Sequence, residues 1–147
     1  MEIKAAEIKH LIRLLVLVIC GTILGVNLYS FNASRLVGNQ LPMPFGYGAA
    51  VVLSGSMEPA FFKGDLILIK QAENYKESEI VVYQDDYHLV VHRILYVEDD
   101  TVITKGDANN VADMPVKLSQ IRGKVVLCIP KAGNVVNFLK TPVGIIV

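Results

Sequence analysis

The chain has 147 residues, enough for one domain of ordinary size and too few for two. Its 14 acidic and 14 basic residues cancel, so the net charge gives no electrostatic basis for a nucleic-acid partner. A hydrophobic fraction of 52% and a mean hydropathy of +0.44 are high for a soluble domain of this length, which indicates that part of the chain lies in lipid.

The first element is an apolar stretch over residues 11–31, in which only two glycines and a threonine interrupt residues 14–26. About 20 such residues cross a hydrocarbon core of about 30 Å as a helix, so we expect a transmembrane anchor here. Lys4, Lys9 and Arg13 precede residue 14, and only Arg35 follows the stretch closely. The positive-inside rule then predicts a cytoplasmic N-terminus at residues 1–10 and an extracytoplasmic remainder.

A cleavable signal peptide is the alternative for this stretch, because charged residues precede a short apolar part. The residues that follow, Phe31, Asn32 and Ala33, have a bulky side chain at the first position of a small-x-small cleavage site. The sequence therefore favours a permanent anchor. Either interpretation places the residues beyond Arg35 outside the cytoplasm.

Residues 32–48 form a juxtamembrane linker whose proline and glycine content opposes regular structure. Its apolar side chains have two open interpretations: they fold under the following domain, or they rest on the bilayer surface. These side chains are Leu41, Met43, Phe45 and Tyr47.

Residues 49–141 have the pattern of an extracytoplasmic β domain. Short apolar or β-branched runs separated by turn residues predict strands at 49–53, 66–69, 80–83, 88–97, 101–104 and 125–129. A short helix is expected at 134–140. The fold class is mainly β, with antiparallel sheets and one N-terminal transmembrane helix. Residues 142–147 are apolar but too few to span a bilayer, so they are either a short natural end or the start of a second membrane span.

Three polar segments carry side chains capable of catalysis. Residues 54–59 (SGSMEP) place Ser56 after an apolar strand, although an ordinary turn is the simpler interpretation. Residues 90–93 (VVHR) place His92 in an apolar strand, where most histidines are structural. Residues 104–113 (TKGDANNVAD) offer Asp107 and Asp113 within a polar turn. Serine, histidine and aspartate can act as nucleophile, base and orienting group, but spacing alone does not show that they meet.

These segments, in this order and after an anchor, resemble the motifs of type I signal peptidases. The serine motif covers residues 51–60 (VVLSGSMEPA) with Gly64-Asp65 behind it, and the later motifs are residues 91–93 (VHR) and 104–107 (TKGD). Most bacterial members have a lysine where this chain has His92, so the resemblance is to the endoplasmic-reticulum type, which also occurs in archaea and some Gram-positive bacteria. It implies a β fold of two antiparallel sheets and a membrane-bound endopeptidase that removes signal peptides from exported pre-proteins.

The resemblance also implies a role for each polar residue. Ser56 is the nucleophile and His92 the general base, and the oxyanion hole consists of the Ser56 backbone N–H and the Ser54 hydroxyl. The family pattern places an orienting aspartate six residues beyond the Lys-Gly-Asp aspartate, which favours Asp113 for that role. Asp107 is then a second required carboxylate, and an exchange of the two roles stays open.

Substrate binding is implied along two strands, the one before the nucleophile and the one before the base. An extended peptide would add to the sheet edge between them, with small residues at the first and third positions before the cut. The residues expected in these two walls are Ala50, Val51, Val52, Leu53, His88, Leu89, Val90 and Val91.

We expect no cofactor and no metal, because His10, His88 and His92 show no ligand spacing with cysteine or acid pairs. Cys20 and Cys128 lie in apolar runs, and we expect both to be unpaired and inert. The expected partners are the signal peptides of pre-proteins, the lipid bilayer and accessory membrane subunits, without nucleic acid. The expected location is the plasma membrane, with a single pass, or the endoplasmic-reticulum membrane in a eukaryote.

Three alternatives remain open. A self-cleaving repressor shares the Ser-Gly motif and the β fold, but that class uses a lysine base and carries a DNA-binding domain. A non-catalytic, membrane-tethered β module that binds partners is the second, and the intact Ser56, His92 and two aspartates argue against it. The third is an enzyme that is active only within a complex.

Overall fold

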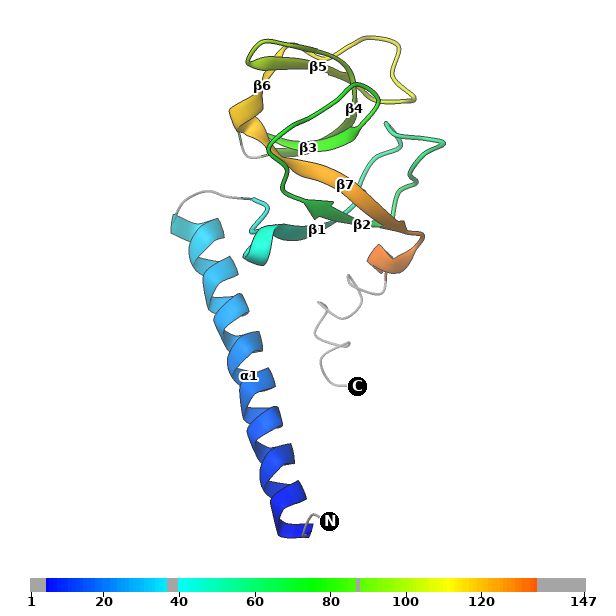
Figure 1. Ribbon diagram of the computed structural model, residues 1–147. Helices are drawn as coiled ribbons and strands as arrows, with labels where there is room; N and C mark the ends of the chain where they lie inside the picture. Colours follow the sequence, from blue (N-terminus) through cyan, green and yellow to red (C-terminus); the bar gives the residue numbers. More distant parts are fainter. Residues whose placement is uncertain (1–4, 37–39, 87, 135–147) are drawn as a thin grey trace.

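The chain consists of a long N-terminal helix and a β domain (Figure 1). The computed structural model describes residues 5–36, 40–86 and 88–134. Helix α1 spans Ala5–Leu36, and its segment Glu7–Asn32 is long and apolar enough to cross a membrane. Within the described chain none of the most apolar part of that segment is buried, so apolar side chains face outward all around the helix. Such a helix suits a lipid surrounding.

Helix α1 extends past the anchor expected at residues 11–31 in both directions. Its 32 residues rise about 48 Å, which exceeds the hydrocarbon thickness of about 30 Å. Residues 32–36, expected to begin an irregular linker, continue the helix instead. The physical reason is that the first helix-breaking residue of this region is Gly38.

The β domain is a seven-stranded sheet in which every adjacent pair of strands is antiparallel, and this confirms the mainly β class. The strand order is β1-β2-β7-β3-β4-β5-β6. The strands are β1 (Tyr47–Val51), β2 (Leu66–Lys70), β3 (Ile80–Asp85), β4 (His88–Glu98), β5 (Thr101–Lys105), β6 (Val116–Lys117) and β7 (Ile121–Ile129). All six expected strands are present. Strand β6 has only two residues, too few for a recognisable pattern. In the first half of β7, Gly123 and its charged neighbours interrupt the apolar run that indicates a strand.

Within the described residues the strands form one curved sheet rather than two separate ones, as the curvature in Figure 1 shows. Strand β7 is the reason, because one half of it pairs with β2 and the other half with β3. Its register shifts against both neighbours, and such irregularities bend a strand. The continuous sheet can therefore enclose two cores.

Two apolar clusters fill the domain. Successive residues of a strand point to opposite faces, so Val81 and Val82 of β3 enter different clusters. The buried members of the first are Leu41, Val52, Met57, Phe61, Ile67, Ile69 and Val82. The buried members of the second are Val81, Tyr83, Ile94, Val102, Val116 and Ile121.

Of the apolar side chains of the linker, some fold under the domain and others are exposed, so each of the two interpretations from the sequence applies to part of the linker. Leu41 is buried in the first cluster and Met43 packs partly against it. Phe45 and Tyr47 are exposed, at 87% and 52%. Phe45 belongs to a 3-10 turn, Pro44–Gly46, which follows Met43 and contacts α1. The first part of the linker thus folds under the domain, while Phe45, in the turn that contacts the helix, and Tyr47 are exposed.

Asp65 connects the loop before β2 with the residues that follow β7. Its carboxylate accepts backbone hydrogen bonds from Phe62 and Lys131, both at 2.9 Å. The bond from Phe62, and after it the bond from Lys131, lowers the pKa of Asp65. Residues 132–134 then begin a helical turn. Residues 135–140 of the helix expected at 134–140, and the apolar end at 142–147, lie outside the described residues.

Candidate active site

Ser56 lies in the loop between β1 and β2, and a neighbouring side chain anchors this loop in the core. Met57, its neighbour, is only 1% exposed and belongs to the first cluster. The backbone N–H of Glu58 donates to the carbonyl of Gly55, which makes a turn around Ser56. The hydroxyl oxygens of Ser54 and Ser56 are 3.1 Å apart. The turn with the buried Met57 thus presents two serine hydroxyls at one point of the surface.

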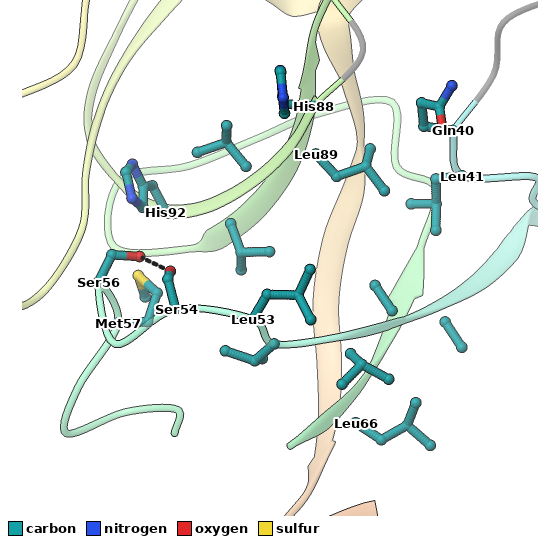
Figure 2. A pocket seen from close by; sticks show the side chains of 16 residues that line it. Gln40, Leu41, Leu53, Ser54, Ser56, Met57, Leu66, His88, Leu89 and His92 are labelled. Carbon is teal, nitrogen blue, oxygen red and sulfur yellow. Dashed lines mark hydrogen bonds between the residues drawn. The ribbon is translucent and has the colours of Figure 1, made fainter. Parts of the chain in front are cut away.

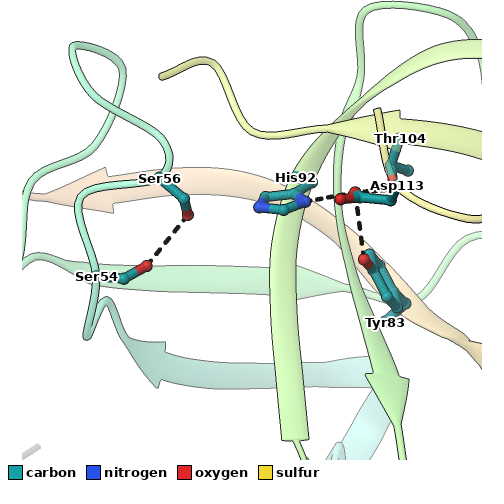
Figure 3. A network of polar contacts seen from close by, with 6 residues as sticks. All are labelled: Ser54, Ser56, Tyr83, His92, Thr104 and Asp113. Atoms are coloured by element: carbon teal, nitrogen blue, oxygen red, sulfur yellow. Dashed lines mark hydrogen bonds and ion pairs between the residues drawn. The ribbon is translucent and has the colours of Figure 1, made fainter. Parts of the chain in front are cut away.

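His92 lies in β4, opposite Val81 of β3, and is 7% exposed. Nδ1 of its ring lies 2.5 Å from Oδ2 of Asp113. Figure 3 shows the ring between Asp113 on one side and Ser56 on the other. In the described chain the hydroxyl of Ser56 is bonded to Ser54 and makes no hydrogen bond to the ring. Catalytic hydrogen bonds are often long in a free enzyme and shorten when substrate binds.

The surroundings of Asp113 determine which nitrogen of His92 carries the proton. Asp113 Oδ2 also accepts hydrogen bonds from the hydroxyls of Thr104, at 2.6 Å, and Tyr83, at 3.3 Å. Burial raises the pKa of Tyr83 to about 12, so its phenol keeps its proton and donates. An oxygen that receives these donors acts as an acceptor toward Nδ1 as well. In neutral His92 the proton is then on Nδ1, and the lone pair of Nε2 faces Ser56.

Asp107 lies elsewhere and pairs with Arg93. Nε and Nη2 of the guanidinium donate to the two carboxylate oxygens at 2.8 and 2.6 Å. Arg93 also donates from Nη1 to the carbonyl of Ser78. The hydrogen bonds to Asp107 raise the pKa of Arg93. Asp107 therefore ties the turn after β5 to the residue that follows His92, and Asp113 alone of the two aspartates reaches the ring.

The turn that contains Asp107 also supports Ser56 directly. The backbone N–H of Ala108 donates to the carbonyl of Ser56 at 2.9 Å. A Cβ on Gly106 would lie 2.6 Å from that carbonyl oxygen, so only glycine permits this close approach. The third polar segment of the sequence thus meets the first through its backbone.

A cleft of about 940 Å³ opens beside the two serines and His92 (Figure 2). All eight residues expected in the substrate walls line it, from Ala50 to Leu53 and from His88 to Val91. Gln40, Leu41 and Leu66 line it too, and nothing in the sequence pattern indicated them. The cleft is mostly apolar, with Ser54, Ser56 and His92 at one end and Gln40 at the other (Figure 2), and a few polar groups in an apolar lining are usual for a binding site.

Three further residues of the site had no role assigned to them from the sequence. Thr104 and Gly106 stand within the third segment, so the motif contained them without assigning them a role. Tyr83 gave no signal, because it looks like any aromatic residue of a strand. In the described chain no group of three His, Cys, Asp or Glu residues could hold a metal ion, and both cysteines are free.

Comparison with known proteins covers the segment that contains these residues. A family model described as Peptidase S24-like matches residues 36–126, which include Ser54, Ser56, His92 and both aspartates. The chain belongs to this family.

Among curated relatives, signal peptidase I W of Bacillus subtilis (strain 168) is 41% identical over 92 residues, which cover 56% of this chain and 48% of that protein. The signal peptidase complex catalytic subunit SEC11 of Candida tropicalis is 46% identical over 71 residues, covering 44% and 43% of the two chains. Its counterpart in Dictyostelium discoideum is 43% identical over 72 residues, covering 44% and 40%. The chain thus spans less than half the length of these relatives.

Proposed function

We propose that the chain is a membrane-anchored serine endopeptidase that cleaves signal peptides from exported pre-proteins. The observation that carries the proposal is that Ser56 and His92 line one end of an apolar cleft and Asp113 contacts the ring of His92 behind it. The names of the relatives support the same activity, since they are signal peptidases from a bacterium and from eukaryotes.

Ser56 is the nucleophile in this mechanism and His92 its general base. As the Ser56 oxygen forms a bond to the scissile carbonyl carbon, its proton passes to Nε2 of His92. The imidazolium then protonates the leaving amine, the C–N bond breaks, and an acyl-enzyme ester remains on Ser56. Water, deprotonated by His92, hydrolyses that ester and regenerates the serine. Asp113 holds the ring and stabilises the imidazolium through Nδ1–H.

The oxyanion of the tetrahedral intermediate requires donors that are already in place. The backbone N–H of Ser56 and the hydroxyl of Ser54 are proposed for this role. The 3.1 Å separation of the two serine hydroxyls supports it, because a carbonyl attacked by Ser56 comes within reach of Ser54.

The substrate is proposed to enter the cleft as an extended strand. Strand β1 is the last strand at one end of the described sheet, and β4 pairs with β5 only from Arg93 onward. The backbones of residues 47–53 and 88–92 thus each keep one edge free of strand pairing within the described chain. A peptide between them can hydrogen-bond to both and point alternate side chains into the apolar walls. Small residues at the first and third positions before the cut would fit best.

Helix α1 is proposed to hold the domain at the membrane surface on the extracytoplasmic side. The basic residues Lys4, Lys9 and Arg13 precede the most apolar part, residues 14–26, which favours a cytoplasmic N-terminus. The exposed Phe45 belongs to the turn Pro44–Gly46, which contacts the helix, and aromatic side chains favour the interface. The location is then the plasma membrane, or the endoplasmic-reticulum membrane in a eukaryote. Accessory membrane subunits are proposed as partners, since two relatives are named as subunits of a complex.

A synthetic pre-protein with alanine at the first and third positions before the cut tests this function. Purified chain in detergent or lipid vesicles should release one product, whose mass places the cut after the second alanine. The matched control replaces that alanine by phenylalanine, and cleavage should then be lost because the apolar walls exclude a large ring. Equal cleavage of both substrates, or cuts scattered along the chain, would reject a signal-peptide specificity.

A further inference from the structure

Asp113 belongs to the segment between β5 and β6, where residues 110–115 form neither helix nor strand. The orienting role proposed for it requires a fixed position, because catalytic geometry is lost with displacements of about 1 Å. The contacts that hold Asp113 therefore matter as much as the residue itself.

Thr104 of β5 holds Asp113 at two points. Its carbonyl accepts the backbone N–H of Asp113 at 2.8 Å, and its hydroxyl donates to Asp113 Oδ2 at 2.6 Å. Thr104 is fully buried, so water does not compete for this hydroxyl. Strand β5, which is paired on both sides, thus fixes both the backbone and the carboxylate of the loop residue.

Tyr83 of β3 adds a donor to the same oxygen from the other side of β4, as Figure 3 shows. The sheet register explains how the two hydroxyls meet. Val81 pairs with His92, and Tyr83 is two residues beyond Val81 on the same face. Thr104 pairs with Ile94, two residues beyond His92, so it lies on that face as well. Three adjacent strands therefore aim one side chain each at Asp113.

We propose that Thr104, assisted by Tyr83, is a positioning residue that fixes the Asp113 carboxylate against Nδ1 of His92 and thereby keeps Nε2 free for Ser56. The proposal rests on the proposed function for its kinetic consequences. Neither hydroxyl touches the substrate cleft in the described chain, so both act through Asp113. Thr104 has the larger effect, because its bond is 2.6 Å long while that of Tyr83, at 3.3 Å, exceeds the usual range for O–H···O bonds.

The first test compares Thr104→Val with Thr104→Ser. Valine keeps the shape of the buried side chain and removes the hydroxyl, so kcat should fall by about tenfold with KM unchanged. Serine keeps the hydroxyl and should restore most of kcat. Tyr83→Phe should cost about two- to threefold. Thr101→Val makes the same substitution at the start of β5, where the hydroxyl bonds to Glu98, and should leave kcat unchanged.

Two further measurements separate positioning from general damage to the fold. In an Asp113→Ala background, Thr104→Val should cost nothing more, because the carboxylate that Thr104 positions is absent; a structural defect would persist there. The ¹⁵N spectrum of His92 in micelles, assigned with His92→Gln, should show an Nδ1–H form that Thr104→Val converts to a mixture of tautomers. An unchanged spectrum with unchanged kcat, or equal losses in the valine and serine variants, would overturn the proposal. If the wild-type chain cleaves no pre-protein, the proposed function fails, and the His92 spectrum still decides the positioning role.

Discussion

The contact between Gly106 and Ser56 leads to a prediction that depends on a single added methyl group. In Gly106→Ala the new Cβ would lie 2.6 Å from the Ser56 carbonyl oxygen. The two must separate by about 0.8 Å to reach 3.4 Å, the lower end of ordinary contact. A second close contact, with the Asn109 side-chain amide at 2.8 Å, can be relieved by rotation. The carbonyl cannot rotate away alone, because it also accepts the N–H of Ala108. Ser56 and its backbone N–H must therefore move.

A displacement of about 1 Å can cost about 100-fold in rate, so we expect kcat for Gly106→Ala to fall by about 10- to 100-fold. Substrate walls are unaffected, so KM should stay within about twofold, since uniform binding is retained. Overpacking should also cost about 1–3 kcal/mol of stability. The assay is pre-protein cleavage together with thermal unfolding in detergent.

The matched control for this prediction is Gly21→Ala in helix α1, where nothing lies within 4 Å of the added Cβ. It should leave kcat and the unfolding temperature unchanged. Wild-type kcat in Gly106→Ala, with an unchanged unfolding temperature, would refute the role given to the close approach of the turn to Ser56.

Three other predictions follow from the same contacts. Asp113→Asn should lower kcat by orders of magnitude, about 10⁴ in the corresponding serine-protease case, while Asp107→Asn should mainly lower the unfolding temperature by breaking the pair with Arg93; full activity in Asp113→Asn with an inactive Asp107→Asn would reverse these roles. His92→Lys should not restore cleavage, because a lysine with its ordinary pKa of about 10.4 stays charged beside a carboxylate; cleavage near the wild-type rate would contradict this. The lowered pKa of Asp65 means that its ionised form contributes stability above the ordinary carboxyl range, which is lost as pH falls through the folded value. The unfolding temperatures of wild type and Asp65→Asn should then differ most at neutral pH and converge in acid. A difference that stays constant with pH would show that ionisation of Asp65 does not stabilise the fold.

The sequence predicted the elements that local pattern controls. The apolar stretch at 11–31 was sufficient for α1, and six β-rich runs located six of the strands. The helix ends were missed, because residues 32–36, of which Asn32, Ser34 and Arg35 are polar, are compatible with a helix although they do not suit lipid. The single curved sheet was also missed, since the register shifts of β7 leave no mark in the hydrophobic pattern.

For the site, the sequence indicated the residues but not the contacts between them. Ser56 and His92 stood in recognisable motifs, whereas the choice between Asp107 and Asp113 depended on which carboxylate the fold brings to the ring. The hydroxyls of Tyr83 and Thr104 reach Asp113 only through the alignment of three strands. That alignment joins residues up to 30 positions apart, and no local spacing encodes it.

The central claim is that the Ser56 hydroxyl performs the cleavage, and the rate of pre-protein cleavage by Ser56→Ala in lipid vesicles tests it most directly. The variant should fold like the wild type, because the loop is held by Met57 and by backbone bonds rather than by the hydroxyl. The account predicts no detectable product from Ser56→Ala and a residual rate from Ser54→Ala, which loses only one oxyanion donor, at a cost of about 10²–10³. Wild-type turnover by a folded Ser56→Ala protein would contradict it.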